Sequence, residues 1–256
     1  YRMLAYQELK VMHKAGELNP SQQLFFKKRP VEGLYDLEKD PDEVNNLASD
    51  SNYQEILLEL RGELKNHVKK MPDLSFYPEN YFLEYGLDNP VQFGQNKKLE
   101  ISRLVDIADL SLESFVRVEK KLRDALVSDY PWDRYWALIV CSSFGKEASS
   151  FFEIAERIVQ KDPERLVALR AAEFLELNNY MDTRPVLMDL LKRALTPTEA
   201  SIMLNTIAVL KDSKPNFEFK IPQGIFKQEW IKNKNSLLKV RVDYINELFN
   251  DYPLFN

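Results

Sequence analysis

The chain has 256 residues, of which 45% are hydrophobic and 29% are charged, and its formal net charge is -5. A mildly acidic chain without a basic stripe argues against a dedicated nucleic-acid binder, because such binding depends mainly on neutralised phosphates. No apolar run approaches the ~20 residues that a membrane-spanning helix needs. The single cysteine, Cys141, excludes an internal disulfide. We therefore expect neither a nucleic-acid partner nor a membrane span.

The first 70 residues are predicted to contain two helices and one short strand. Residues 2–14 have a helical pattern that ends at Gly16, a plausible C-cap. The alternation of apolar and polar residues over 33–37 predicts a strand, and Asp40-Pro41 predicts a turn. Residues 52–68 predict an amphipathic helix, for which Ser51 and Gln54 form a possible capping box.

A long irregular stretch follows over residues 71–98. It contains three prolines and many aromatic residues, among them Phe76, Tyr77, Tyr81, Phe82, Tyr85 and Phe93. The aromatic residues could form a surface on which sugars stack, or they could pack the stretch against its neighbours. We favour packing, because aromatic side chains provide most of the burial that an irregular segment can achieve. The second group, Tyr130, Trp132, Tyr135 and Trp136, is interpreted in the same way, although an exposed subset would indicate an interface.

The rest of the chain is predicted to be a series of helices. The expected spans are 99–109, 112–127, 132–144, 147–160, 164–178, 183–194, 197–211 and 228–250, with an extended segment at 213–226. Asp162-Pro163-Glu164 and Thr196-Pro197-Thr198-Glu199 are typical helix starts.

An internal repeat is indicated by three prolines, Pro131, Pro163 and Pro197, each of which opens the second helix of a pair. The helices that follow carry small or apolar residues at similar offsets, namely Ala137, Ala171 and Leu204. Stacked helix pairs share a core that one pair cannot form alone. The pattern predicts a HEAT-like or armadillo-like superhelix, with a generic helical bundle as the alternative.

Residues 31–64 carry a motif that resembles the C-terminal signature of type I sulfatases. Its parts are Leu34-Tyr35-Asp36-Leu37, then Asp40-Pro41-Asp42-Glu43, then Asn45-Asn46-Leu47-Ala48, followed by a helix. The preceding Leu18-Asn19-Pro20 and Phe25-Phe26 also look like bacterial members of this group. The resemblance covers about the first 70 residues. It implies that the strand over 33–37 should look orphaned, because the family packs it in a sheet whose other strands are missing here. The residues themselves indicate turns and scaffold, and not a site, because Asp-Pro forces a turn and asparagine bonds to the local backbone.

The resemblance implies a parent enzyme that hydrolyses sulfate esters or sulfamates, with glycans as the expected substrates, in the periplasm or outside the cell. Such enzymes use a formylglycine made from a Cys/Ser-x-Pro-x-Arg motif, together with calcium. That motif is absent, because Cys141 is followed by Ser142-Ser143-Phe144-Gly145. We therefore expect the chain to be cut from a longer protein whose upstream catalytic domain is its partner, with a sulfated glycan at the parent's cleft. We assign no catalytic, cofactor-binding or metal-binding residue to this chain.

Three weaker candidates for a site have structural interpretations that we prefer. His13 could line the parent's substrate cleft, but His13 and His67 are expected on solvated helix faces. Cys141 lies among apolar residues and is expected to be a buried, inert thiol. The acidic run from Asp36 to Glu43 fails the EF-hand template, because Pro41 replaces the required glycine and Leu47 stands where the bidentate glutamate belongs.

The sequence thus predicts a mainly α fold: a sulfatase C-terminal segment with a short strand over 1–70, and a helical-repeat domain over 71–256. The predicted function is that of a non-catalytic C-terminal part of a sulfatase-like hydrolase, inactive alone, that provides scaffold, shapes a cleft or mediates assembly. A stand-alone helical-repeat protein-interaction module is the alternative. An independent enzyme that uses paired carboxylates is disfavoured, because no spacing singles out an acid/base pair.

Overall fold

The computed structural model describes residues 4–232 and 236–247, which are mainly α-helical and form no strand. The mainly α fold is therefore confirmed. The chain divides into two compact units, residues 1–66 and 67–256, and each is described here by itself. The domain boundary predicted between residues 70 and 71 stays a prediction.

The first unit contains short helices separated by long loops. Its helices are α1 (Leu4–Ala15), α2 (Pro20–Gln23), the 3-10 helices Leu24–Phe26 and Ser51–Tyr53, and the larger part of α3 (Gln54–Lys70). The helix α1 ends, as predicted, before Gly16, whose φ of 73° suits glycine. The helix α2 was not predicted. It is held by a capping box in which Gln22 N donates to Asn19 Oδ1 over 2.9 Å and Asn19 N donates to Gln22 Oε1 over 3.0 Å.

The strand predicted over residues 33–37 is wrong, because no neighbouring strand of the described residues pairs with it. Instead, the side chain of Asn46 takes the place of a partner: Leu34 N donates to its Oδ1, and its Nδ2 donates to Glu32 O, both over 3.0 Å. Leu47 N adds a bond of 2.8 Å to Leu34 O. Alternation in the sequence indicates a strand, but a ladder needs a second strand.

The start of α3 also differs from its prediction. Asp50, and not Ser51, provides the cap, since Asn52 N donates to Asp50 Oδ1 over 2.9 Å. A 3-10 turn over Ser51–Tyr53 then leads into α3, which begins at Gln54. Ser51 therefore begins a 3-10 turn, which is tighter than an α-helical turn, and Gln54 begins α3.

The second unit is a series of helices that ends in paired layers. In chain order it holds α4 (Glu79–Tyr85), α5 (Pro90–Asn96), α6 (Lys98–Ala108), α7 (Phe115–Leu126), α8 (Pro131–Phe144), α9 (Phe152–Lys161), α10 (Arg165–Leu177), α11 (Arg184–Lys192), α12 (Pro197–Ser213), α13 (Gln228–Ile231) and α14 (Leu237–Ile245), with 3-10 helices at Leu74–Phe76, Asp109–Leu112 and Gly145–Phe151. Most of the predicted spans between 99 and 212 are recovered within a few residues.

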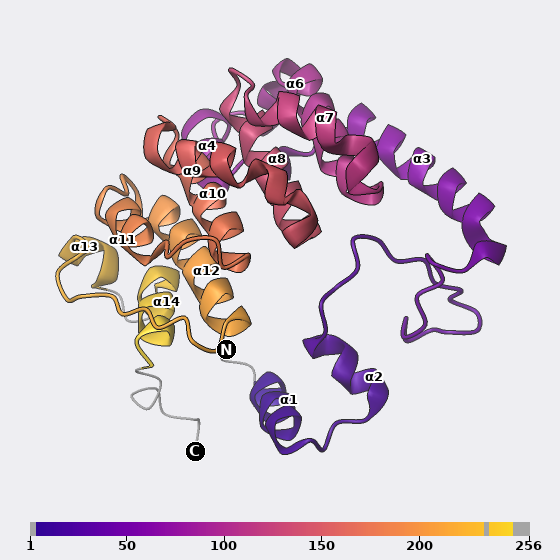
Figure 1. Ribbon diagram of the computed structural model, residues 1–256, viewed down its shortest axis with the longest axis horizontal. Coiled ribbons are helices and arrows are strands. Elements are labelled where there is room, and N and C mark those ends of the chain that lie inside the picture. Colours follow the sequence, from indigo (N-terminus) through magenta and orange to yellow (C-terminus); the bar gives the residue numbers. More distant parts are fainter. Residues whose placement is uncertain (1–3, 233–235, 248–256) are drawn as a thin grey trace. The chain divides into compact units, whose positions relative to one another are not determined.

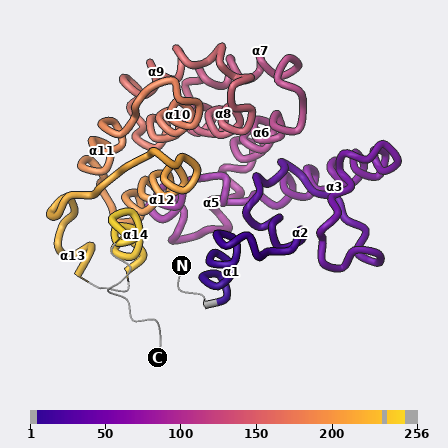
Figure 2. The backbone as a smooth tube through the Cα atoms, turned by 60° about the horizontal axis from the view of Figure 1, so that its bottom comes forward, coloured from indigo at the N-terminus to yellow at the C-terminus, as the bar shows by residue number. Residues whose placement is uncertain are grey.

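The helices from α7 to α14 pack as successive pairs. Within a pair, α7 contacts α8, α9 contacts α10, α11 contacts α12 and α13 contacts α14. The second helices, α8, α10, α12 and α14, pack against one another in that order, and Figures 1 and 2 show them as an inner row, with α7, α9 and α11 along the outer side. This arrangement is a helical repeat, as the proline spacing predicts. Pro131 and Pro197 open α8 and α12 as expected, whereas Pro163 precedes Glu164, which caps α10 at Arg165. Its assignment to the HEAT-like or armadillo-like class stays a prediction.

The repeat has a common core and a common polar link. Ala137, Ala171 and Leu204, the residues aligned by the repeat, are all fully buried. Ion pairs connect successive layers: Arg103 of α6 with Asp133 of α8 at 2.9 Å, Arg134 of α8 with Asp162 at the end of α9 at 2.7 Å, and Arg165 of α10 with Glu199 of α12 at 2.8 Å. Because each pair spans about one repeat, these bonds fix how each layer stacks on the next.

In two regions of the second unit, the structure differs from what the sequence predicts. The stretch 71–98 is not fully irregular, since it contains α4 and α5. The helix predicted over 228–250 is broken: α13 is one short turn and α14 begins at Leu237, capped by the Ser236 hydroxyl, which accepts from Lys239 N over 3.2 Å. Residues 233–235 and 248–250 of that prediction lie outside the described residues.

Candidate functional site

Residues 71–98, called the crossing segment below, pack against the inner helices. Trp136 Nε1 donates to Phe76 O over 2.8 Å, and the two rings lie 4.9 Å apart between centroids. Tyr77 is 3% exposed and contacts the ring of Trp132 edge-on. The packing interpretation of these aromatic residues is therefore confirmed. Tyr85 and, in the second group, Tyr130 are exceptions, because they are 59% and 56% exposed.

A pocket of about 580 Å³ lies between the crossing segment and the inner helices. The crossing segment contributes Leu74, Ser75, Tyr77, Pro78, Glu79 and Phe82; α8 contributes Tyr135; α10 contributes Arg170 and Glu173; and α12 contributes Ile202, Asn205, Thr206 and Val209. Residues of three successive inner helices and of the crossing segment therefore line the same open cavity. Its size falls in the range of small-molecule sites.

Among the described residues that line the pocket, Arg170 is the only cation, and it is held by its neighbours. Its Nη2 donates to Tyr135 Oη over 2.9 Å, and its Nη1 forms an ion pair with Glu173. Its Cζ lies 5.1 Å from the centroid of the Tyr135 ring. Burial acts to lower the pKa of Arg170, but Glu173 and Tyr135 outweigh it and raise the pKa above the ordinary value. The guanidinium therefore stays charged and is held in one orientation.

The other polar groups of the pocket include both donors and acceptors. Glu173 Oε2 accepts from Arg170 and, over 3.4 Å, from Thr206 Oγ1, while its Oε1 has no partner among the described residues and is not buried. Asn205 Oδ1 accepts from Arg241, which leaves the Asn205 amide nitrogen with no donor bond among the described residues. Ser75 and Glu79 stand exposed at the rim. One cation against two carboxylates gives the lining a net charge of -1.

Sequence reasoning missed this pocket. Its central residues, Arg170 and Glu173, are separated by one turn in a helix that is otherwise almost entirely buried and apolar. Two opposite charges at that spacing within an otherwise mostly apolar helix were the available signal. The matching residues of the crossing segment could not be assigned to it, because their position depends on how the segment lies across the inner helices.

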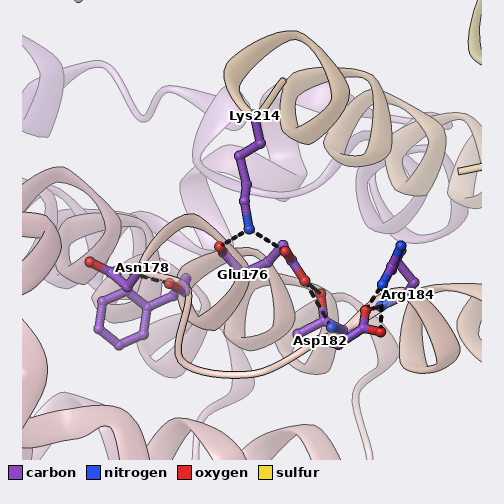
Figure 3. Close-up of polar contacts among 7 residues, drawn as sticks. Glu176, Asn178, Asp182, Arg184 and Lys214 are labelled. Atoms are coloured by element: carbon purple, nitrogen blue, oxygen red, sulfur yellow. Dashed lines mark hydrogen bonds and ion pairs between the residues drawn. The ribbon is translucent and has the colours of Figure 1, made fainter. Parts of the chain in front are cut away.

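A second polar cluster lies where α10 leads into α11, and Figure 3 shows it. The buried carboxylate of Glu176 accepts from Thr183 N and Thr183 Oγ1 over 2.8 and 3.0 Å, and Lys214 Nζ donates to both the side chain and, over 2.7 Å, the backbone oxygen of Glu176. Arg184 binds Asp182 through two nitrogens, and its hydrogen bonds lower the pKa of Asp182. Because protein donors satisfy both oxygens of Glu176, this cluster ties α10 to the end of α12 and leaves no group for chemistry.

Cys141 is fully buried in α8, as the sequence predicts. Burial raises the pKa of its thiol to about 12. A thiolate is the reactive form of cysteine, so this side chain lacks what a nucleophile needs at neutral pH.

The two histidines are both exposed, as the solvated-face interpretation expects. The ring of His13 stacks on Phe26, with centroids 3.9 Å apart and planes 8° apart. His67 lies in the last turns of α3, where a basic side chain suits the helix end. Neither imidazole is joined to a carboxylate by a described bond.

The acidic run from Asp36 to Glu43 forms a turn that its own backbone satisfies. Asp40 is only 8% exposed, and its carboxylate accepts from Val44 N over 3.1 Å and from Asn45 N over 2.7 Å. Asp36 pairs with Lys39 over 2.6 Å, and this hydrogen bond lowers the pKa of Asp36. These contacts occupy the carboxylates of Asp36 and Asp40 with donors of the protein itself.

The formylglycine and calcium centre that the sulfatase resemblance implies does not fit the residues of this chain. Cys141 is buried and lacks the proline and arginine of the modification motif. Across residues 4–232 and 236–247, no three or more His, Cys, Asp or Glu side chains are grouped so as to hold a metal ion. Nor does any helix in those ranges have the length and apolar character needed to cross a membrane.

A comparison with curated proteins finds one relationship. The chain is 38% identical over 80 residues to an ulvan-active sulfatase of Formosa agariphila. Part of the chain is distantly related to a sulfatase. The matched segment makes up 31% of this chain and 13% of that enzyme, so it spans a small part of the relative's length. No family model matches the chain, and no solved structure matches it.

Proposed function

We propose that the chain is the non-catalytic C-terminal part of a sulfatase-like hydrolase, in the periplasm or outside the cell, and that residues 1–66 dock onto an upstream catalytic domain. The observation that carries the proposal is the 38% identity to part of a sulfatase. It is supported by the motif over residues 31–64 and by the lack of a Cys/Ser-x-Pro-x-Arg segment. The parent enzyme would hydrolyse sulfate esters or sulfamates, with glycans as the expected substrates.

The apolar side of α3 supports the docking. Ile56, Leu60 and Leu64 follow one another at four-residue spacing on one side of the helix, and they are 47%, 46% and 64% exposed. We call these three residues the α3 stripe. A row of exposed large apolar side chains on one helix face is typical of a surface that another domain covers. In this proposal the catalytic domain covers the α3 stripe.

The helical repeat is then an appendage that shapes the parent's cleft or mediates assembly. Stacked helix pairs form a rigid support on which loops and pockets are held. The pocket beside Arg170 gives this domain a feature of its own.

The parent is tested by the intact mass of the native gene product, with peptide mapping upstream of Tyr1. The proposal predicts a product much larger than 30.0 kDa that contains a Cys/Ser-x-Pro-x-Arg segment. A mature product near 30.0 kDa with nothing upstream would contradict it. Activity of the isolated 256 residues on a sulfate ester would contradict the non-catalytic role.

The docking surface is tested in the same full-length protein. The double variant Leu60→Asp/Leu64→Asp places two charges on the α3 stripe and should lower the thermal midpoint of the catalytic domain. Leu58→Asp is the matched control, because Leu58 is 58% exposed but lies on the opposite side of the helix. Equal effects of the double variant and the control would remove the α3 stripe as a docking surface.

A second function, a stand-alone helical-repeat interaction module, is favoured by one observation. The large hydrophobic core of the chain is formed by residues of the second unit, which therefore has the core of an independent domain. The mass measurement separates the two functions, since the stand-alone module predicts the 30.0 kDa product.

A further inference from the structure

The pocket beside Arg170 is built by four separate elements that each contribute a polar group. Glu79 comes from the crossing segment, Tyr135 from α8, Glu173 from α10 and Asn205 from α12. Elements far apart in the sequence are held here by the ion-pair links of the repeat and by the bond from Trp136 to Phe76 O. The geometry of the polar groups is therefore fixed before a ligand arrives.

The net charge of the described lining disfavours an anion as the main ligand, although Arg170 Nε is buried and has no partner among the described residues. Arg170 is already neutralised by Glu173, and Glu79 adds a second carboxylate at the rim. A sulfate or phosphate site needs cationic or backbone donors without a competing carboxylate. A cation is disfavoured as well, because the carboxylate of Glu173 is shared with Arg170 and Thr206. A neutral ligand fits this balance.

The hydrogen-bonding groups suit a ligand that both donates and accepts. Tyr135 Oη accepts from Arg170, so its own proton can be donated. Glu173 Oε1 accepts, and the Asn205 amide nitrogen donates; both lack other partners among the described residues. Hydroxyl groups are the ligand atoms that match interleaved donors and acceptors, since each can serve in both roles.

The remaining lining is apolar. Phe82 is partly buried, Ile202 is partly buried and Val209 is 47% exposed, so all three present carbon surface to the cavity. A ligand with hydroxyl edges and C–H faces satisfies both parts of the lining. Sugar rings have this character.

We propose that this pocket binds a neutral carbohydrate, of roughly one to three sugar units given the typical volume of such sites. Arg170 acts as a positioning residue, because it orients the carboxylate of Glu173 and the hydroxyl of Tyr135. Glu173, Tyr135 and Asn205 contact sugar hydroxyls, and Phe82 packs on a ring face. The proposal goes beyond the sulfatase relationship and does not require an upstream domain.

The test is a titration of the 256-residue chain with xylotriose, cellotriose and mannotriose, followed by calorimetry and by ligand-observed NMR. We expect at least one of the three to bind. Val209→Trp fills the pocket and should weaken that binding more than tenfold. Leu195→Trp is the matched control, because Leu195 is 68% exposed and does not line the pocket, and it should change binding less than twofold.

A milder variant guards against misfolding of the tryptophan variant. Asn205→Ala removes one donor and should weaken binding about fivefold, whereas Asn216→Ala, at an exposed position outside the pocket, should leave binding unchanged. Three results would overturn the proposal: no binding of any of the three sugars, binding that Val209→Trp leaves intact, or displacement of the sugar by sodium sulfate or spermidine at equal concentration.

Discussion

The two units of the chain achieve order by different means. Residues 67–256 hold a continuous core in which many large side chains are fully buried, including Leu104, Leu138, Phe151, Phe174 and Leu190. Among the described residues of 1–66, Leu18 and Leu57 are the buried hydrophobic ones. In this unit, polar side chains fix much of the local conformation. Asn19 caps α2, Asp40 accepts a bond that closes a turn, and Asn46 accepts from Leu34 N. Such bonds define a conformation, but they add little net free energy of unfolding.

The comparison indicates that only the second unit is self-sufficient. A unit of about 66 residues with so few buried side chains lies near the lower limit of independent stability. The exposed α3 stripe belongs to this unit. We infer that residues 1–66 reach their full stability against a partner, and that the helical repeat does not need one.

The largest expected effect on the free energy of unfolding appears when one leucine-to-alanine substitution is made in each unit. Leu169→Ala in α10 removes a fully buried side chain and should lower the free energy of unfolding by about 3 kcal/mol. Leu64→Ala in α3 removes a side chain that is 64% exposed and should cost less than about 0.5 kcal/mol. Urea unfolding followed by far-ultraviolet circular dichroism measures both, because helices of both units contribute to the signal. Similar losses in the two variants would contradict the comparison.

The next largest loss in the free energy of unfolding is expected for the polar cluster around Glu176. Glu176→Ala leaves Lys214 and Thr183 without their acceptor and should cost about 3 kcal/mol or slightly less, as expected when one partner of a buried ion pair is removed. Asp124→Ala, which breaks an exposed pair with Lys120, should cost less than about 0.5 kcal/mol. The same urea titration checks both. If Glu176→Ala proved as mild as Asp124→Ala, the cluster would not be a tie between α10 and α12.

The attachment of the crossing segment should have a smaller effect. Trp136→Phe removes the donor to Phe76 O but keeps an aromatic ring, so it should cost about 1 kcal/mol. Trp230→Phe serves as the control, since no described hydrogen bond from that indole is lost. Thermal unfolding followed by circular dichroism gives both values. An unchanged midpoint for Trp136→Phe would mean that the segment is held by its rings alone.

The smallest effect concerns Cys141, whose thiol pKa of about 12 keeps it protonated in the fold. The raised pKa means that burial favours the neutral thiol, so the folded chain should resist a thiol reagent at pH 8 and become reactive only upon unfolding. Labelling with iodoacetamide, with and without urea, measures this by mass. Rapid labelling of the folded chain would contradict the packing of α8.

The sequence predicted those features that depend on local chemistry and periodicity. The proline-marked start at Pro197 was correct, since Thr196 caps α12 with an accepting bond of 3.1 Å. Ala137, Ala171 and Leu204 were correctly placed as equivalent core positions. The strand over 33–37 failed because pairing depends on a second segment, and Asn46 took that role from outside the predicted strand.

The pocket could not be predicted in full for a similar reason. Spacing places Arg170 and Glu173 on one side of a helix, but only the packed repeat brings Tyr135 and Asn205 to the same cavity. The position of Phe82 depends in turn on two helices, α4 and α5, that the sequence did not reveal. The absence of a strong periodic signal in such short helices explains why they were missed.

Hydrogen exchange tests most directly whether residues 1–66 depend on a partner. The measurement compares the 256-residue chain with the native gene product, peptide by peptide. We expect strong protection of α8, α10 and α12 in both samples, and protection of residues 54–66 that rises only in the native product. Equal and strong protection of residues 54–66 in the isolated chain would contradict the claim, because the first unit would then be stable without a partner.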